Sequence, residues 1–215
     1  IVVSSKNPEI DNLCSNKPRL ILLNKIDLSE DEVTNKWIKE LSSKNIGVLP
    51  VNCNNGNGMN KIKPMLNNLL KEKHDRLKLK GINKIVDRVM VVGIPNVGKS
   101  SFINKIARNS IAKTGNRPGV TKSKQWIKTK VGIELMDTPG ILWPKLESRK
   151  TQLNLAFTGA IKDEIMDVEE LALKLIEVLS VNYSDRIISR YKLKSLSDNP
   201  LENMENIARN RGAII

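Results

Sequence analysis

The residues best suited to chemistry form one glycine-rich stretch in the middle of the chain, Gly-Ile-Pro-Asn-Val-Gly-Lys-Ser at residues 93–100. It follows a short apolar run at residues 89–92 and precedes a stretch with helical character at residues 102–106. Glycines at this spacing let backbone N–H groups converge on phosphate oxygens, and the following helix adds the positive end of its dipole. The stretch therefore predicts a site for the phosphates of a nucleoside triphosphate.

The residue types within this loop have separate expected roles. Lys99 is placed to bridge the outer phosphates, and the hydroxyl of Ser100 is a ligand for Mg²⁺. We expect the nucleotide phosphates to be held by Asn96, Val97, Gly98, Lys99, Ser100 and Ser101.

A second motif, Asn24-Lys25-Ile26-Asp27, follows an apolar strand expected at residues 18–23. The carboxylate of Asp27 can accept from both the ring N–H and the exocyclic amine of guanine, whereas adenine lacks this pair of donors. Lys25 can lay its alkyl chain on the base, and Asn24 can brace the loop. The motif therefore predicts a guanine nucleotide.

A third loop, rich in asparagine and glycine, follows the strand expected at residues 46–51. Its first residues, Asn52 and Cys53, lie where a backbone amide could contact the guanine oxygen. A plain loop role for Cys53 is an equally good interpretation. Such loops suit the end of a strand because asparagine and glycine tolerate left-handed backbone conformations.

The metal side of the site is predicted from Asp137-Thr138-Pro139-Gly140. Asp137 is expected to hold Mg²⁺, usually through water, and the Gly140 N–H to bind the γ-phosphate. Thr121 is our candidate for a hydroxyl that closes on Mg²⁺ only in the triphosphate state, and Thr114 is the alternative. We prefer Thr121 because it follows a flexible Pro-Gly pair and precedes a strand.

A catalytic group is harder to assign. Ile141 follows the Asp-Thr-Pro-Gly motif where Ras-like proteins place a glutamine that orients water, and an isoleucine has no such function. The chain's single histidine, His74, lies in a polar connector and is interpreted as a surface residue. Transition-state contacts therefore fall to Lys99, Thr121 and Gly140.

The spacing of apolar residues predicts the strands and helices that position these loops. Apolar strands alternate with helices in the first two thirds, which predicts an α/β fold with a mostly parallel, doubly wound sheet and its ligand at the carboxyl edge. Ser29 with Glu32 predicts a capped helix, and Asp167 with Glu170 predicts another in a helical module.

We expect two domains, residues 1–145 and residues 146–215. The predicted elements are strands at 18–23, 46–51 and 89–92, a hairpin at 125–136, and helices at 29–41, 59–80 and 167–179.

The amino-acid composition limits the classes of molecule that the protein can be expected to bind. Lysine and arginine number 36 against 23 acidic residues, a net charge of +13, with 3% aromatic residues. This balance favours a polyanion, and nucleic acid over a membrane because no membrane-binding amphipathic stretch is present. No apolar run approaches about 18 residues, so we expect no stable membrane association. Cys14 and Cys53 fit no disulfide or zinc pattern, which suits a reducing cytoplasm.

The order of the motifs is unusual, because the base-recognition motif precedes the phosphate loop by about seventy residues. One phosphate loop in 215 residues argues against two tandem domains, whereas circular permutation accounts for the order. This order, with the phosphate loop, Thr121, Asp137-Thr138-Pro139-Gly140, and the flanking sequences at 140–145 and 158–162, resembles the circularly permuted ribosome-assembly GTPases. The likeness is greatest to the RbgA (YlqF) branch.

That resemblance implies binding of GTP or GDP with Mg²⁺, and GTP hydrolysis coupled to late maturation of the large ribosomal subunit. It implies contact of rRNA and the subunit precursor with the basic surface and the helical module. It also implies stimulation by K⁺, with Asn96 at the loop position associated with that ion. We expect a monomer in the bacterial cytoplasm, an organellar homologue being the alternative.

Two departures from the family bear on hydrolysis. The family's upstream segment, with a histidine implicated in hydrolysis, does not match residues 1–215, and the family's C-terminal region extends further. We therefore expect a slow GTPase that depends on K⁺ and on its ribosomal partner. The alternative is a GTP-gated RNA-binding or membrane-associated switch with negligible turnover.

Overall fold

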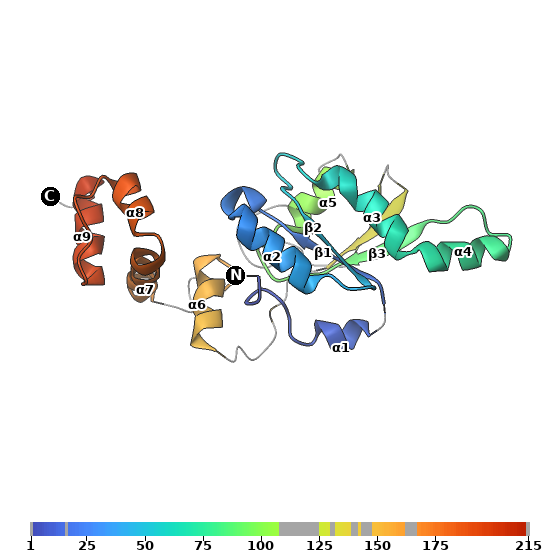
Figure 1. Ribbon diagram of the computed structural model, residues 1–215, viewed down its shortest axis with the longest axis horizontal. Helices are drawn as coiled ribbons and strands as arrows, with labels where there is room; N and C mark the ends of the chain where they lie inside the picture. The colour runs from blue at the N-terminus through green and yellow to red at the C-terminus, as the bar shows by residue number, and fades with distance from the viewer. Residues whose placement is uncertain are drawn as a thin grey trace. The chain divides into compact units, whose positions relative to one another are not determined.

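The structure is a computed structural model, and it describes residues 2–15, 17–107, 125–129, 132–138, 142, 148–161 and 167–213. The chain divides into two compact units, Ile1–Lys145 and Leu146–Ile215. The first contains strands and helices, and the second is helical in its described residues (Figure 1). Within the described ranges no helix is both long and apolar enough to cross a bilayer. The base-recognition motif at residues 24–27 and the phosphate loop at residues 93–100 both belong to the first unit.

The strands of the first unit lie close to their expected places. β1 (Arg19–Leu23) pairs in parallel with β2 (Ile46–Pro50). β3 (Asp87–Val91) pairs in parallel with β5 (Ile133–Asp137), which pairs antiparallel with β4 (Gln125–Lys128). The described ladders thus form two sheets where the sequence predicts one, because an apolar run encodes burial of a strand but not the identity of its neighbour.

One hydrophobic core joins the two sheets. Helices α3 (Ile62–Leu69) and α5 (Lys99–Ala107) contribute to it from the same side, while α2 (Asp31–Leu41) lies on the other side of the β1–β2 pair (Figure 1). Burying these side chains supplies the main stabilisation of the unit. The core contains Leu49, Val51, Cys53, Ile62, Leu66, Phe102, Ile103, Ile106, Ala107, Ile127, Ile133 and Leu135.

The long helix expected over residues 59–80 is broken. A 3₁₀ turn, η2 (Met59–Lys61), leads into α3, and the chain leaves helical geometry at Leu70 before α4 (Lys71–Leu79) begins. Gly81 ends α4 as predicted: its φ is +77°, its N–H donates to Lys78 O, and the Ile82 N–H donates to Leu77 O. This paired C-cap requires the left-handed conformation that glycine adopts freely.

The start of α2 differs from the expected capping box. Its N-cap is Glu30, with no side-chain capping bond. The Ser29 hydroxyl instead donates to Ile26 O at 3.0 Å and lies 2.9 Å from Thr34 Oγ1. Ser29 therefore closes the preceding 3₁₀ turn, η1 (Ile26–Leu28), because that turn ends at the residue where the cap was expected.

The second unit contains α6 (Arg149–Phe157), α7 (Val168–Asn182), α8 (Ser184–Tyr191) and α9 (Pro200–Asn210). Asp167 caps α7 as expected, since its carboxylate accepts from the N–H groups of Glu169 and Glu170. Buried Asn203 on α9 holds the preceding loop through two hydrogen bonds to the Ser197 backbone. Local polar bonds of this kind fix the turns between short helices.

Candidate nucleotide-binding site

The predicted nucleotide loops leave from the carboxyl ends of parallel strands. Asn24 follows β1, Asn52 follows β2 within two residues, and the phosphate loop follows β3. Val91 and Asp137, the last residues of β3 and β5, are partners in register. Ligands of doubly wound folds bind at this edge, so the topology places the motifs where a nucleotide is expected.

The phosphate loop is shaped by two left-handed residues. Asn96 has φ +59° and Gly98 has φ +99°. A β-carbon at Gly98 would collide with Nδ2 of Asn24, so the position requires glycine for space as well as for conformation. Helix α5 begins at Lys99 directly afterwards, and the first amides of a helix have no intrahelical acceptor. The loop therefore has the backbone form of a phosphate cradle.

Lys99 is held against the backbone of its own loop. Its side-chain ammonium donates to Gly93 O at 2.9 Å and to Ile94 O at 2.8 Å, and the residue is 9% exposed. These bonds fix the charged end of the side chain between the start of the loop and the start of α5. A positive charge in that place favours binding of a polyphosphate.

Asn24 connects three of the loops. Its Nδ2 donates to Val97 O at 3.0 Å, which reaches the phosphate loop across 73 residues of sequence. Its Oδ1 accepts from the Cys53 N–H at 3.1 Å, which reaches the loop after β2. One amide side chain thus satisfies a donor and an acceptor on two different loops, and the bracing role predicted for Asn24 takes this specific form.

Lys25 makes a second link to the phosphate loop. Its backbone is left-handed, with φ +61°, and its ammonium donates to Asn96 O at 3.2 Å. Asp27 follows in the turn η1 and is exposed to solvent. The base-recognition motif therefore lies beside the phosphate loop, with the Asp27 carboxylate open to a ligand.

The loop after β2 is organised by its own asparagine. Asn52 is 4% exposed, and its Oδ1 accepts from the N–H groups of Asn54 at 2.9 Å and Asn55 at 3.2 Å. Cys53 is buried, which raises the pKa of its thiol to about 11, an effect that Lys105 partly offsets. The Cys53 N–H is engaged by Asn24, so these two residues hold the loop in place, and their contact with guanine remains a prediction.

Thr138 makes a structural contact at the site that the sequence interpretation did not predict. Its hydroxyl donates to Val91 O at 2.7 Å and thereby ties the end of β5 to the end of β3. The signal was present in the Asp-Thr-Pro-Gly motif, whose threonine received no role. Of the other predicted residues, Thr121, its alternative Thr114, Gly140 and Ile141 lie outside the described residues, and Asp137 is described only as the last residue of β5.

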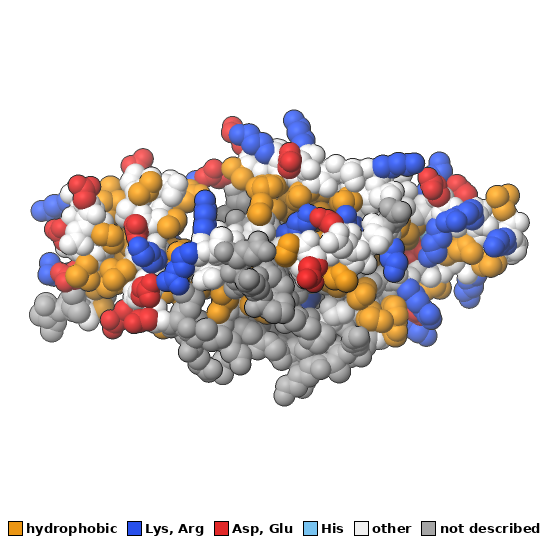
Figure 2. All heavy atoms as spheres, turned by 90° about the horizontal axis from the view of Figure 1, so that it is seen from below, with side chains coloured by type: hydrophobic (Ala, Val, Ile, Leu, Met, Phe, Trp, Pro, Cys, Tyr) orange, Lys and Arg blue, Asp and Glu red, His pale blue; other side chains and the backbone are white. Residues whose placement is uncertain are grey.

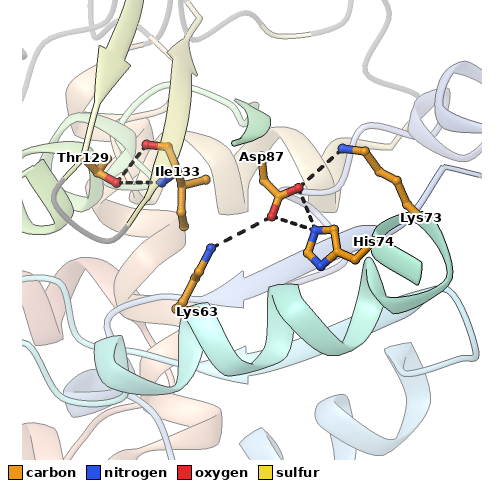
Figure 3. Close-up of polar contacts among 6 residues, drawn as sticks. All are labelled: Lys63, Lys73, His74, Asp87, Thr129 and Ile133. Carbon is orange, nitrogen blue, oxygen red and sulfur yellow. Dashed lines mark hydrogen bonds and ion pairs between the residues drawn. The ribbon is translucent and has the colours of Figure 1, made fainter. Parts of the chain in front are cut away.

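His74 is an anchor rather than the surface residue expected. Its Nε2 lies 3.0 Å from both oxygens of buried Asp87, with Lys73 Nζ at 3.4 Å and Lys63 Nζ at 3.9 Å (Figure 3). Burial opposes ionisation of this carboxyl, but the bonds and charges of His74 and Lys73 outweigh it and lower the pKa of Asp87. Asp87 begins β3, six residues or about 20 Å of extended chain before the phosphate loop, so the cluster serves structure at the opposite edge.

The residues present fit a guanine nucleotide with Mg²⁺. Gly98 adds no side chain to the phosphate loop, and Lys99 supplies positive charge there. The hydroxyl of Ser100 lies in the first turn of α5. Hydroxyl and carboxylate oxygens are the ligands that Mg²⁺ prefers. Asp27 offers two acceptors to a base.

Comparison with known proteins decides the family. The model of the 50S ribosome-binding GTPase family matches residues 88–206. Ribosome biogenesis GTPase A of Bacillus licheniformis is 44% identical over 215 residues, which cover 100% of this chain and 76% of that protein. The chain belongs to the RbgA/YlqF family of 50S ribosome-binding GTPases. Mitochondrial ribosome-associated GTPase 1 of Mus musculus is 31% identical over 217 residues, covering 97% of this chain and 66% of that protein.

Solved structures of RbgA/YlqF proteins share the fold. YlqF of Thermotoga maritima in its GNP-bound form superposes with a TM-score of 0.53 at 22% identity, covering 98% of this chain and 84% of that one. A GDP-bound YlqF structure gives a TM-score of 0.54 at 21% identity, covering 97% and 82%. The predicted fold class, a permuted P-loop GTPase domain with a helical addition, is thereby confirmed.

Proposed function

We propose that this RbgA/YlqF-family chain is a GTP hydrolase that acts in the late assembly of the large ribosomal subunit. The observation that carries the proposal is the double hydrogen bond of Asn24, which joins the base-recognition loop, the loop after β2 and the phosphate loop into one site. A guanine nucleotide is the ligand whose base and phosphates need these loops together.

Each side chain then has a distinct task. Asp27 accepts from the two guanine donors, Lys99 contacts the outer phosphates, and Ser100 and Asp137 hold the metal side of the site. Mg²⁺, when bound, neutralises charge that develops on the phosphates during transfer. Thr138 keeps the end of β5 beside β3, so that the segment containing Gly140 starts from a fixed point. Thr121 and Gly140 sense the γ-phosphate.

Hydrolysis by this chain alone is slow. Ile141 takes the place of a water-orienting glutamine, so another group must position the attacking water. K⁺ supplies additional positive charge at the phosphates, with Asn96 as its ligand. The left-handed backbone of Asn96 supports this role, because it places an amide-bearing residue at the tip of the loop. Replacement of Asn96 by alanine should remove K⁺ stimulation while leaving GTP affinity within about threefold.

The two units have separate tasks. Residues 1–145 form the GTPase domain, and residues 146–215 form a helical domain that contacts the ribosomal particle. The strand that ends at Asp137 is followed in sequence by the connection to the helical unit, which supports transmission of the γ-phosphate state along this path. The protein acts as a cytoplasmic monomer, with the large-subunit precursor and its rRNA as partners.

The decisive experiment swaps the base. Asp27→Asn replaces one acceptor oxygen by an N–H donor, so affinity should fall for GTP and rise for xanthosine triphosphate, whose base carries a carbonyl where guanine carries an amine. The matched control is Asp31→Asn, at an exposed position of α2. Unchanged preference in Asp27→Asn would refute the assigned base contact.

Assembly function is tested by sedimentation. The chain should pellet with large-subunit precursor particles in the presence of a non-hydrolysable GTP analogue and remain in the supernatant with GDP. The same particles should raise the rate of GTP hydrolysis in K⁺ buffer. Nucleotide-dependent pelleting without any rise in hydrolysis would favour a switch with negligible turnover.

A further inference from the structure

The net positive charge of the chain belongs to one of its two units. Residues 146–215 contain 10 lysines and arginines against 11 acidic residues, a net charge of −1. Residues 1–145 contain 26 against 12, a net charge of +14. A long-range field that attracts a polyanion therefore originates in the first unit, although the family resemblance implies RNA contact by the helical unit as well.

Among the described residues of the first unit, basic residues concentrate on α4 and the segment that follows it. We call residues 71–84 the basic arm. It carries six cations against two acids, and all six are exposed. In the part of the chain that the structure describes, Lys73 is the one of these six cations with an ion pair, to Asp87, so the charge of the other five is available to a partner. The cations are Lys71, Lys73, Arg76, Lys78, Lys80 and Lys84.

The helical spacing organises these cations into a stripe. Lys73 and Arg76 lie three residues apart on one face of α4, and Lys80, the C-cap residue, follows four residues later. At about 1.5 Å per residue they span about 10 Å along the axis. A stripe of this kind suits a polymer with regularly spaced negative charges better than a single small anion.

Two sets of contacts fix the backbone of the basic arm. At its base, His74 and Lys73 bind the buried carboxylate of Asp87, which begins β3 (Figure 3). At its far end, the C-cap formed by Gly81 fixes the turn. Figure 1 shows α4 extending away from the strands of its own unit. Pre-organised cations lose less conformational entropy on binding than flexible ones.

The pattern of apolar residues on α4 favours RNA over a lipid surface. Its only apolar side chains are Leu77, which is half-buried, and Leu79, which is 88% exposed. A helix that lies in a membrane interface needs a continuous apolar face, which α4 lacks. In Figure 2 lysine and arginine side chains at this end of the first unit alternate with isolated apolar ones.

We propose that the basic arm, residues 71–84, is a site that binds the phosphate backbone of RNA. This inference rests on the ribosome-assembly function proposed above and names the surface through which the GTPase unit meets its RNA partner. Binding there is electrostatic and independent of base sequence, because the arm presents lysine and arginine to phosphates and no aromatic side chain for stacking.

The test compares two triple variants of the full chain. Arg76→Gln, Lys78→Gln and Lys80→Gln together remove three charges from the basic arm while leaving the anchor residues His74, Lys73 and Asp87 in place. Lys17→Gln, Lys36→Gln and Lys39→Gln together remove three charges from exposed positions elsewhere in the first unit. The probe is a labelled RNA duplex of about 20 base pairs, titrated between about 50 and 200 mM salt.

The arm variant should bind the duplex at least about tenfold more weakly at low salt, and its salt slope should fall by about 3. The control variant should keep most of the wild-type slope. Equal losses in both variants, an unchanged slope in the arm variant, or binding of wild type to anionic vesicles in preference to RNA would each overturn the inference. Affinity for a fluorescent GTP analogue should be unchanged in both variants, so failure of the GTPase proposal would show separately in that measurement and in the Asp27→Asn experiment.

Discussion

Replacement of Asn24 by alanine should weaken the protein and its nucleotide site together. The change removes the bonds to Val97 O and from the Cys53 N–H, at 3.0 and 3.1 Å. Each is worth about 0.5–1.5 kcal/mol, so the free energy of unfolding should fall by about 1–3 kcal/mol. If the same bonds hold the loops ready for GTP, affinity should fall by a factor of about 5 to 150.

Unfolding of the first unit can be followed separately from that of the second. All three tryptophans, Trp37, Trp126 and Trp143, lie within residues 1–145, so their fluorescence during urea unfolding follows that unit alone. GTP affinity is measured with a fluorescent analogue. The matched control is Asn35→Ala, at an exposed position of α2, where the free energy of unfolding should change by less than about 1 kcal/mol.

Two results would refute the reasoning about Asn24. If Asn24→Ala unfolds at the same urea concentration as Asn35→Ala, the two hydrogen bonds contribute nothing net to the unit. If Asn24→Ala is destabilised but binds GTP as tightly as wild type, the loops do not need this link to recognise a nucleotide, and Asn24 is purely structural.

Three further predictions follow from other contacts. Lys99→Met should reduce GTP affinity by at least about 10-fold, because it removes the ammonium proposed to contact the outer phosphates and a charged hydrogen bond is worth about 1.5–3 kcal/mol. Affinity for guanosine, which has no phosphates, should be unchanged by calorimetry. Asp87 has a pKa below its usual 3.8, so its contribution to stability is present above that pH and is lost as the pH falls through the lower folded value. The stability difference between wild type and Asp87→Asn in urea should therefore shrink as the pH falls below about 4. Burial and a pKa of about 11 should protect Cys53 from iodoacetamide at about pH 8, so native protein should be alkylated at Cys14 alone, and mass spectrometry showing rapid alkylation of Cys53 would contradict the buried loop.

The parts of the site that sequence predicts well are those encoded locally. The phosphate loop, the base-recognition motif and the ends of helices at Gly81 and Asp167 each depend on a few consecutive residues whose backbone preferences decide the outcome. The ends of β1, β2 and β3 lie within two residues of expectation for the same reason. Fold class follows because a strand and helix alternation leaves few ways to arrange a parallel sheet.

Contacts between distant segments could not be predicted. Nothing near Asn24 in sequence indicates that its amide faces Val97, and the acceptor is a backbone carbonyl that carries no residue-specific signal. His74 meets Asp87 only because the helix breaks at Leu70, a break that the apolar spacing did not reveal. The uneven division of charge, by contrast, could be computed from the sequence alone, because a boundary after residue 145 was expected there.

The strands that precede the two nucleotide loops belong to two different sheets. The base-recognition loop belongs to the β1–β2 pair and the phosphate loop to the β3–β5–β4 sheet, and no described backbone ladder crosses the seam between them. In the function proposed above, a nucleotide held by Asp27 and Lys99 would bridge the two sheets, as the hydrogen bonds of Asn24 and Lys25 to the phosphate loop already do. Because one hydrophobic core also joins the sheets, the nucleotide would add to a connection that packing already makes.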